Sequence, residues 1–357
     1  MSDSIPEFES YLNFDEFIPH YCLIKSEYNK YYFIYSALNC LTNIKSFLIY
    51  LYKYNDINEP SMYYSILYKT IYTIVEKIKD NENNKINFDP KEITEFILKK
   101  IELFKKKSNQ DPRILIDFIY TSFLVNEKNI PTLFITNDLS YASLNISEMN
   151  NMDLEGINAI IKRSAKCQNI KCQNNSEVVK SFSTLHFSLK PNKEYTIYDC
   201  FSDFLKNENE KEYTCKKCSC INKTDSKYKF HRLPEDIIIF IYYDGETKDY
   251  EDFYYKFDEI LDFTNCDFIS SKIKFKKYLL SSLIACKCPK TEDEIFYTFC
   301  RKDSKDSKDS YLIYFSGDKN VRDEKKNVKN KLSKLKTDQY ERKRSYPYVL
   351  VYNAVNN

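Results

Sequence analysis

Glycine is the scarcest informative residue in this chain. Three glycines occur among 357 residues, at Gly156, Gly245 and Gly317. P-loops and dinucleotide-binding turns both need clustered glycines, because the phosphate lies directly against the backbone. The sequence therefore excludes both kinds of nucleotide site. It also predicts that turns with positive φ use asparagine, which tolerates that conformation better than most residues.

Long apolar runs and a charge excess are also absent. No apolar run approaches the roughly 20 residues of a membrane-spanning helix. The acidic sequence 1–19 does not resemble a signal peptide. The net charge of +2 gives no global attraction to nucleic acid or membranes. We therefore expect a soluble intracellular protein, cytoplasmic or nuclear, whose cysteines are metal ligands or core residues rather than disulfides.

Four cysteines form two closely spaced pairs: Cys167 with Cys172, and Cys215 with Cys218. Strand-like segments lie between and after them, which puts each pair at the base of an expected hairpin. Zinc is commonly bound by two thiolates from each of two tight turns, so we expect one structural zinc ion. Cys220 is close enough to replace Cys218, and chance pairing among twelve cysteines is the alternative. Cys200, in an amphipathic segment, is expected in the core.

The pattern along the chain predicts an α+β fold. Apolar residues recur at helical spacing in four early segments, which begin near Tyr31, Pro60, Pro90 and Pro112. In the last two, an aspartate precedes the proline, as is typical of a helix N-terminus. Later apolar segments are typical of strands, at 185–189, 237–243, 253–257, 278–285, 295–300, 311–315 and 346–352. The charged repeat 301–310 is expected to be a disordered loop.

The order of these elements resembles the ubiquitin-specific protease family. The likeness is carried first by the paired cysteines, an LxL strand at 185–189, a short helix, the CxxC pair, and Leu233-Pro234 before an apolar strand. Four further segments resemble family motifs: SALNCL (36–41) resembles NSxLQxL, NQDP (109–112) resembles QQDAxEF, 278–285 resembles YxLxAVIxH, and 346–352 resembles AYxLxY. The resemblance covers about residues 20–353.

The resemblance implies the hand-shaped, papain-like α+β fold of that family. After a lead-in at 1–19, a single domain at 20–353 would contain three parts. The helical thumb would span about 20–155, the zinc-bearing β fingers about 160–232, and the antiparallel β palm about 233–353. The palm would include the loop 301–310 and a basic insertion at 322–344.

The family's catalytic residues do not all have a counterpart here. Matching the motifs without gaps puts Tyr32 at the nucleophilic cysteine, Glu27 at the oxyanion asparagine and Phe296 at the histidine base. Only the orienting aspartate is retained, as Asp318. A phenol has a pKa of about 10, and phenylalanine carries no proton, so this set cannot perform thiol hydrolysis.

The resemblance thus implies a catalytically inactive family member that acts as a ubiquitin-binding module or scaffold in a larger protein assembly. Ubiquitin binding would be weak and independent of the ubiquitin tail, because Tyr32 and Phe296 would fill the tail channel. One alternative is an active deubiquitinase with a displaced cysteine, Cys40 or Cys22. Another is a structural subunit that contacts RNA through the basic stretch 322–344.

Overall fold

The structure is a computed structural model of the chain. It describes residues 21–24, 31–47, 85–88, 91–106, 110–124, 158–210, 212–222, 227–244, 254–287, 295–302, 311–315 and 345–355. Several sequence-based expectations lie outside these residues: the lead-in 1–19, Glu27, the helix after Pro60, most of the loop 301–310, Asp318 and the basic stretch 322–344. In the described part of the chain, no helix combines the length and apolar character needed to cross a membrane.

The chain divides into two compact units. Unit 1 consists of Met1–Ser140 and Leu280–Asn353, and unit 2 consists of Tyr141–Leu279 and Ala354–Asn357. Both combine helices with sheets that are mainly antiparallel, so the α+β class predicted from the sequence is confirmed.

The described helical part of unit 1 contains α2 (Tyr32–Leu41), α5 (Lys91–Lys100), the 3-10 turn η3 (Glu102–Lys105) and α6 (Pro112–Leu124), and residues 45–47 are also helical. Helix α6 begins where the sequence predicts, because Asp111 Oδ1 accepts the backbone N–H of Arg113 at 2.7 Å. Pro112 then takes the first helical position, which needs no N–H donor. Helix α2 has no side-chain cap at Tyr31, so burial of its apolar face must stabilise it.

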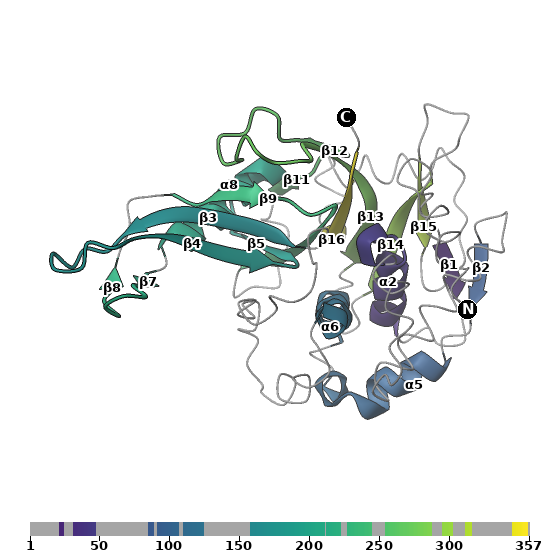
Figure 1. Cartoon of the computed structure of the whole chain (residues 1–357). Helices are drawn as coiled ribbons and strands as arrows, with labels where there is room; N and C mark the ends of the chain where they lie inside the picture. The colour runs from purple at the N-terminus through teal and green to yellow at the C-terminus, as the bar shows by residue number, and fades with distance from the viewer. Residues whose placement is uncertain are drawn as a thin grey trace, which may run out of the picture. The chain divides into compact units, whose positions relative to one another are not determined.

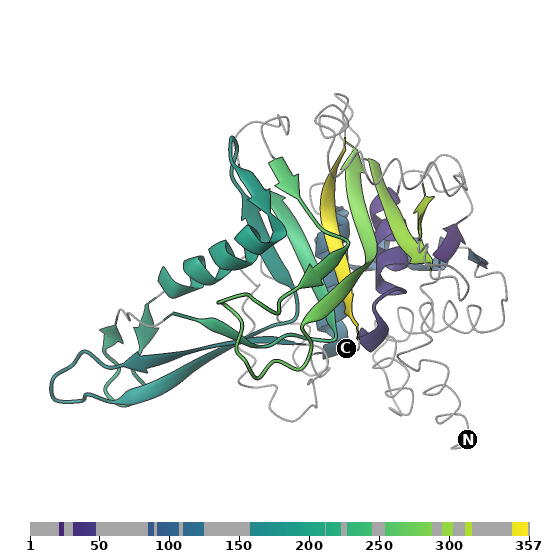
Figure 2. The same cartoon turned by 90° about the horizontal axis from the view of Figure 1, so that it is seen from above.

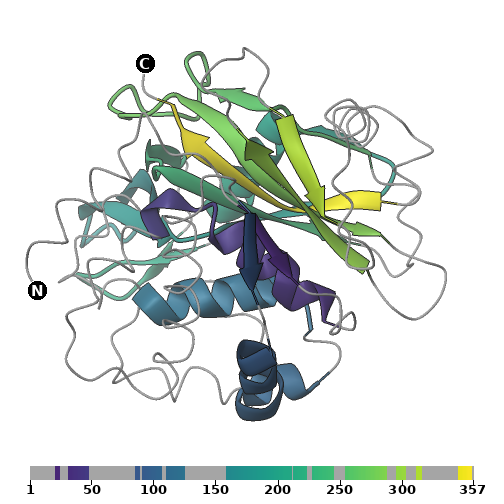
Figure 3. The same ribbon diagram turned by 90° about the vertical axis from the view of Figure 1, so that its right-hand side faces the viewer.

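The helices of unit 1 share an aromatic core. Phe104 of η3 lies 6.0 Å from Phe33 of α2 and 5.8 Å from Phe118 of α6, measured between ring centroids. Phe47, which follows α2, lies 5.6 Å from Tyr120 of α6. Figure 3 shows α2 and α6 packed together, with the strands of unit 1 on the other side of α2.

The strands of unit 1 follow the order β15-β14-β13-β16. Their bounds are Tyr311–Phe315 (β15), Ile295–Lys302 (β14), Lys277–Lys287 (β13, which begins in unit 2) and Ser345–Ala354 (β16). β13 and β14 are antiparallel, with Ser282 opposite Cys300 and Cys286 opposite Phe296. A short parallel pair joins β1 (Tyr21–Ile24) to β2 (Lys85–Phe88). The strands predicted at 278–285, 295–300, 311–315 and 346–352 are thus confirmed.

Unit 2 contains a long hairpin of β3 (Ala159–Lys166) and β4 (Asn175–Phe182), with β9 (Lys229–Arg232) on the other edge of β3. Burial alternates along β3, so one face of this sheet is covered and the other is open. A small hairpin of β7 (Tyr213–Thr214) and β8 (Ile221–Asn222) lies near the far end of the long hairpin (Figure 2).

Among the described residues, unit 2 also contains one helix and five more strands: α8 (Ile197–Glu210), β5 (Leu185–Leu189), β6 (Glu194–Thr196), β10 (Asp236–Tyr243), β11 (Tyr254–Lys256) and β12 (Ile260–Asp262). β10 pairs in parallel with β5 and is buried along most of its length, as its continuous apolar sequence predicts. Phe201 of α8 has its ring against those of Phe187, Phe230, Phe263 and Phe268. Its neighbour Cys200 is buried, as expected.

Candidate functional site

The first cysteine pair lies in the turn that joins β3 to β4, beyond the strands and not at the base of the hairpin as the sequence suggested. The Cys167 backbone N–H donates to the oxygen of Asn174 at 2.8 Å and closes the loop. Within this loop, the backbone carbonyl oxygen of Asn169 accepts hydrogen bonds from the backbone N–H groups of Cys172 and Gln173, each at 2.9 Å. Gln173 has a φ of 44°, which ends the turn. These bonds bring the two thiols to the same side of the turn.

The second pair lies in the turn between β7 and β8. The Cys215 N–H donates to the Cys220 oxygen at 2.9 Å, and the Ser219 N–H donates to the Cys215 oxygen at 2.8 Å. Ser219 has a φ of 57°. Across the described residues, positive φ occurs at Gln173, Asn192 and Ser219, so the expectation that asparagine serves such turns is right at one position and wrong at two.

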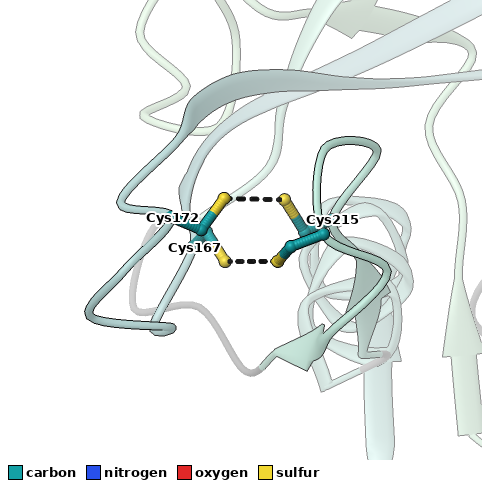
Figure 4. A group of neighbouring side chains, drawn as sticks. Cys167, Cys172 and Cys215 are labelled. Carbon is teal, nitrogen blue, oxygen red and sulfur yellow. Dashed lines mark hydrogen bonds between the residues drawn. The ribbon is translucent and has the colours of Figure 1, made fainter.

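The sulfur atoms of the two turns meet in one cluster. The Sγ atoms of Cys167, Cys172, Cys215 and Cys218 all lie within 4.8 Å of one another. The Cys167–Cys218 distance is 3.5 Å and the Cys172–Cys215 distance is 3.8 Å (Figure 4). A tetrahedral ion with Zn–S bonds of about 2.3 Å requires S–S separations of roughly 3.8 Å. The four thiols can therefore hold a metal ion of that size.

The electrostatics of the cluster favour a cation. Backbone N–H groups of Cys218 and Lys217 lower the pKa of Cys215, which favours its thiolate form. Burial, followed by the neighbouring thiols, raises the pKa of Cys167 above its usual value. Without a cation, the four thiols cannot all ionise so close together. A bound cation would allow it, because it stabilises all four thiolates at once.

Little apolar surface stabilises this end of unit 2. The buried residues around the sulfurs are Ala165, Cys167, Tyr213 and Cys215, with Val178 partly buried against them.

Cys220 is not in the four-sulfur cluster; its Sγ accepts a hydrogen bond from Asn169 Nδ2 at 3.4 Å. The geometry therefore favours Cys218 over Cys220 as the fourth ligand.

The positions matched to the family nucleophile and base lie on elements that contact each other. Tyr32 is the first residue of α2 and is half-buried, and Phe296 lies in β14 and is buried. Helix α2 packs on β14 within unit 1 (Figure 1). Near the end of α2, Asn43 Nδ2 lies 3.4 Å from Cys300 Sγ of β14. Glu27 and Asp318 lie outside the described residues.

Phe296 packs on one member of a cluster that the sequence did not reveal, formed by Asp111, Arg113 and Tyr348. Its ring lies 5.2 Å from that of Tyr348 in β16. The guanidinium of Arg113 stacks 3.6 Å above the Tyr348 ring and donates to Tyr348 Oη. Asp111 Oδ2 accepts hydrogen bonds from Arg113 Nη2 at 2.7 Å and Tyr348 Oη at 2.9 Å. The sequence marks Asp111 as a helix cap and as part of the NQDP segment, but not as a partner of Tyr348, which is 237 residues away.

Cys40 and His186 lie in packed surroundings. Cys40 is fully buried beside Ser282 Oγ, at 3.6 Å, and burial raises its thiol pKa to about 12. Only the backbone of Cys22 is described. His186 bonds to Thr184 Oγ1 at 3.0 Å and stacks on Tyr242, so it serves packing in β5.

The family model for ubiquitin carboxyl-terminal hydrolases matches residues 29–352, which is most of the chain. The chain belongs to this family. A search of curated proteins found no significant match. The described elements supply the mixed α+β arrangement of the ubiquitin-specific protease fold, with the cysteine cluster at the tip of its long hairpin.

Solved structures show the same fold. One is the SAGA Ubp8/Sgf11/Sus1/Sgf73 DUB module bound to ubiquitin aldehyde, with a TM-score of 0.55, 15% identity, and coverage of 95% of this chain and 70% of that one. A second is a variant of this module bound to monoubiquitin, with a TM-score of 0.53, 16% identity, and coverage of 95% and 69%. At this identity the likeness establishes the fold alone.

Proposed function

We propose that this family member does not hydrolyse ubiquitin conjugates and instead acts as a ubiquitin-binding module or scaffold in a protein assembly. The observation that carries the proposal is the pair Tyr32 and Phe296, which occupy the matched nucleophile and base positions on two elements in contact. Helices α2, α5 and α6 would form the thumb, the β3–β4 hairpin the fingers, and β13 to β16 part of the palm.

The geometry of α2 and β14 supports this assignment. Near the end of α2, Cys40 Sγ lies 3.6 Å from Ser282 Oγ of β13, and Ser282 lies opposite Cys300 of β14. Tyr32 lies eight residues before Cys40 on the helix, or about 12 Å, and Phe296 lies four residues before Cys300 on the strand, or about 13 Å. The distance from this contact back to Tyr32 along α2 is therefore similar to the distance back to Phe296 along β14. This spacing is compatible with Tyr32 and Phe296 lying near the same end of the two packed elements, as a nucleophile and a base must.

Chemistry at these positions argues against hydrolysis. A phenol, with a pKa of about 10, is a poor nucleophile without a base, and a phenyl ring accepts no proton. Phe296 is fixed in place, because Tyr348 covers it and Arg113 and Asp111 hold Tyr348. An opening for a peptide tail would require this packing to be broken.

A displaced active site is disfavoured by the burial of Cys40. A thiol with no exposed surface and a pKa of about 12 is neither ionised at neutral pH nor within reach of a substrate. The RNA-contacting alternative rests on the composition of 322–344 alone, whereas the inactive-hydrolase reading rests on residues in defined elements.

For the metal centre, we infer zinc held by Cys167, Cys172, Cys215 and Cys218. Four sulfur ligands at tetrahedral spacing suit zinc better than the harder cations, which prefer oxygen. The ion would be structural, since four protein ligands leave no open position for a reactant. It would join two turns that have little apolar surface of their own.

Ubiquitin carrying a C-terminal electrophile tests the loss of hydrolysis, since it labels only an accessible thiolate at the catalytic position. We expect no labelling of the full-length protein and no turnover of a fluorogenic ubiquitin substrate. Tyr32→Cys alone should also remain unlabelled, because without a base the new thiol keeps a pKa of about 8.5. Labelling of the unmodified protein that disappears in Cys22→Ser or Cys40→Ser would overturn the proposal and identify the nucleophile.

A further inference from the structure

The cysteine turns carry exposed apolar side chains. Over the described residues, the two most exposed large hydrophobic residues are Ile170, at 84%, and Ile221, at 68%. Ile170 lies between the first pair of cysteines, and Ile221 follows the second turn. We call residues 166–171 and 216–221 the knuckle tip. Two branched aliphatic side chains left in water at one end of a sheet indicate an interaction surface.

A hydrogen bond between the turns holds together the two backbone segments that carry the isoleucines. Asn169 Nδ2 donates to Cys220 Sγ at 3.4 Å, and each isoleucine is the next residue along the chain. Asn169 Oδ1 also accepts the Lys171 N–H at 3.0 Å, so this side chain is held in place on both sides. The two isoleucines are therefore presented on a fixed backbone, which lowers the entropic cost of binding a partner.

The same surface is basic. Lys166, Lys171, Lys216 and Lys217 are all exposed, and residues 166–175 and 213–222 contain no aspartate or glutamate. A metal ion of charge +2 bound to four thiolates would carry a net charge of −2, so four lysines leave the loaded tip at +2. No ion pair within the described part of the chain neutralises these four lysines. The tip therefore attracts an acidic partner.

We propose that the knuckle tip binds an acidic protein segment that carries aliphatic side chains, which would cover Ile170 and Ile221 while its carboxylates face the lysines. Single-stranded RNA fits less well, because base recognition relies on exposed aromatic rings and the only aromatic residue of these turns, Tyr213, is 7% exposed. This inference does not depend on the loss of hydrolysis, since the tip is remote in sequence from Tyr32 and Phe296.

A random 16-residue peptide display library, selected on metal-loaded full-length protein, tests the proposal. Binders are then counter-selected on Ile170→Ser/Ile221→Ser, after its metal content has been shown to be unchanged. We expect tip-dependent peptides rich in glutamate or aspartate and in leucine or isoleucine. For these peptides, fluorescence anisotropy should show at least about tenfold weaker binding for the double variant and for Lys216→Glu/Lys217→Glu.

The matched control is Ile260→Ser in β12, which removes an isoleucine that is 57% exposed in another part of unit 2 and should leave peptide affinity unchanged. Three results would overturn the proposal: no tip-dependent peptide, enrichment of basic peptides, or tighter tip-dependent binding of labelled oligouridylate than of any selected peptide.

Discussion

The Asp111–Arg113–Tyr348 cluster should contribute measurably to the stability of unit 1. The side chains of Arg113 and Asp111 are 11% and 13% exposed, so the ion pair is largely shielded from water. Arg113→Ala would leave Asp111 without its main counter-charge and Tyr348 without the cation stacked on its ring. Truncating one partner of a buried pair costs about 3–5 kcal/mol.

The expected loss is smaller than that upper range. Asp111 keeps hydrogen bonds from Tyr348 Oη and from the Arg113 backbone N–H, and water can reach the carboxylate once the guanidinium is gone. We therefore expect Arg113→Ala to lower the free energy of unfolding by about 2–3 kcal/mol. Arg113→Lys should lower the free energy of unfolding by about half as much. Lysine keeps the positive charge, but its ammonium group cannot reproduce the two-pronged geometry of the guanidinium.

Urea unfolding followed by circular dichroism measures these differences. Lys99→Ala is the control, because Lys99 pairs with Glu95 at a similar distance, 3.1 Å, with the two side chains 68% and 46% exposed. Its expected cost is about 0.5 kcal/mol or less. If Arg113→Ala costs no more than Lys99→Ala, the cluster does not hold Tyr348 against Phe296, and the argument for a filled channel is refuted.

Three further predictions concern the metal, ubiquitin and acid. Purified protein should contain about one equivalent of zinc, and Cys215→Ser should lose it; less than about half an equivalent in intact protein would contradict the assignment. Labelled ubiquitin should bind at micromolar affinity or weaker, unchanged when its last residues are removed; submicromolar, tail-dependent binding would show an open channel. Asp199 accepts the Thr196 N–H at 2.8 Å at the start of α8, and bonds to Thr196 lower its pKa below the usual 3.8. The stability that this cap contributes is present above pH 4 and is lost as pH falls through the lowered pKa, so the deficit of Asp199→Asn, about 0.5–1 kcal/mol at pH 6, should shrink toward pH 3. A deficit that does not change with pH would mean that the carboxylate is not the cap.

Local signals in the sequence determined the elements. Pro112 with its preceding aspartate fixed the start of α6, because capping involves only neighbouring residues. Alternating or continuous apolar runs were enough to predict strands β10, β13 and β16. The pattern of apolar residues within a strand depends on whether one or both of its faces are buried. The two cysteine pairs predicted a four-sulfur cluster for the same reason, because each turn positions its own thiols.

Tertiary structure decided what depends on residues far apart in the chain. The packing of the β7–β8 turn against the β3–β4 turn decides that Cys218, and not Cys220, joins the cluster. Cysteine spacing alone cannot predict this packing. The contact of Tyr348 with Arg113 spans 235 residues, so its strength comes from packing that only the folded chain creates. The burial of Cys40 is likewise a property of α2 lying against β13 and β14, because the sequence around a thiol does not determine how much water reaches it.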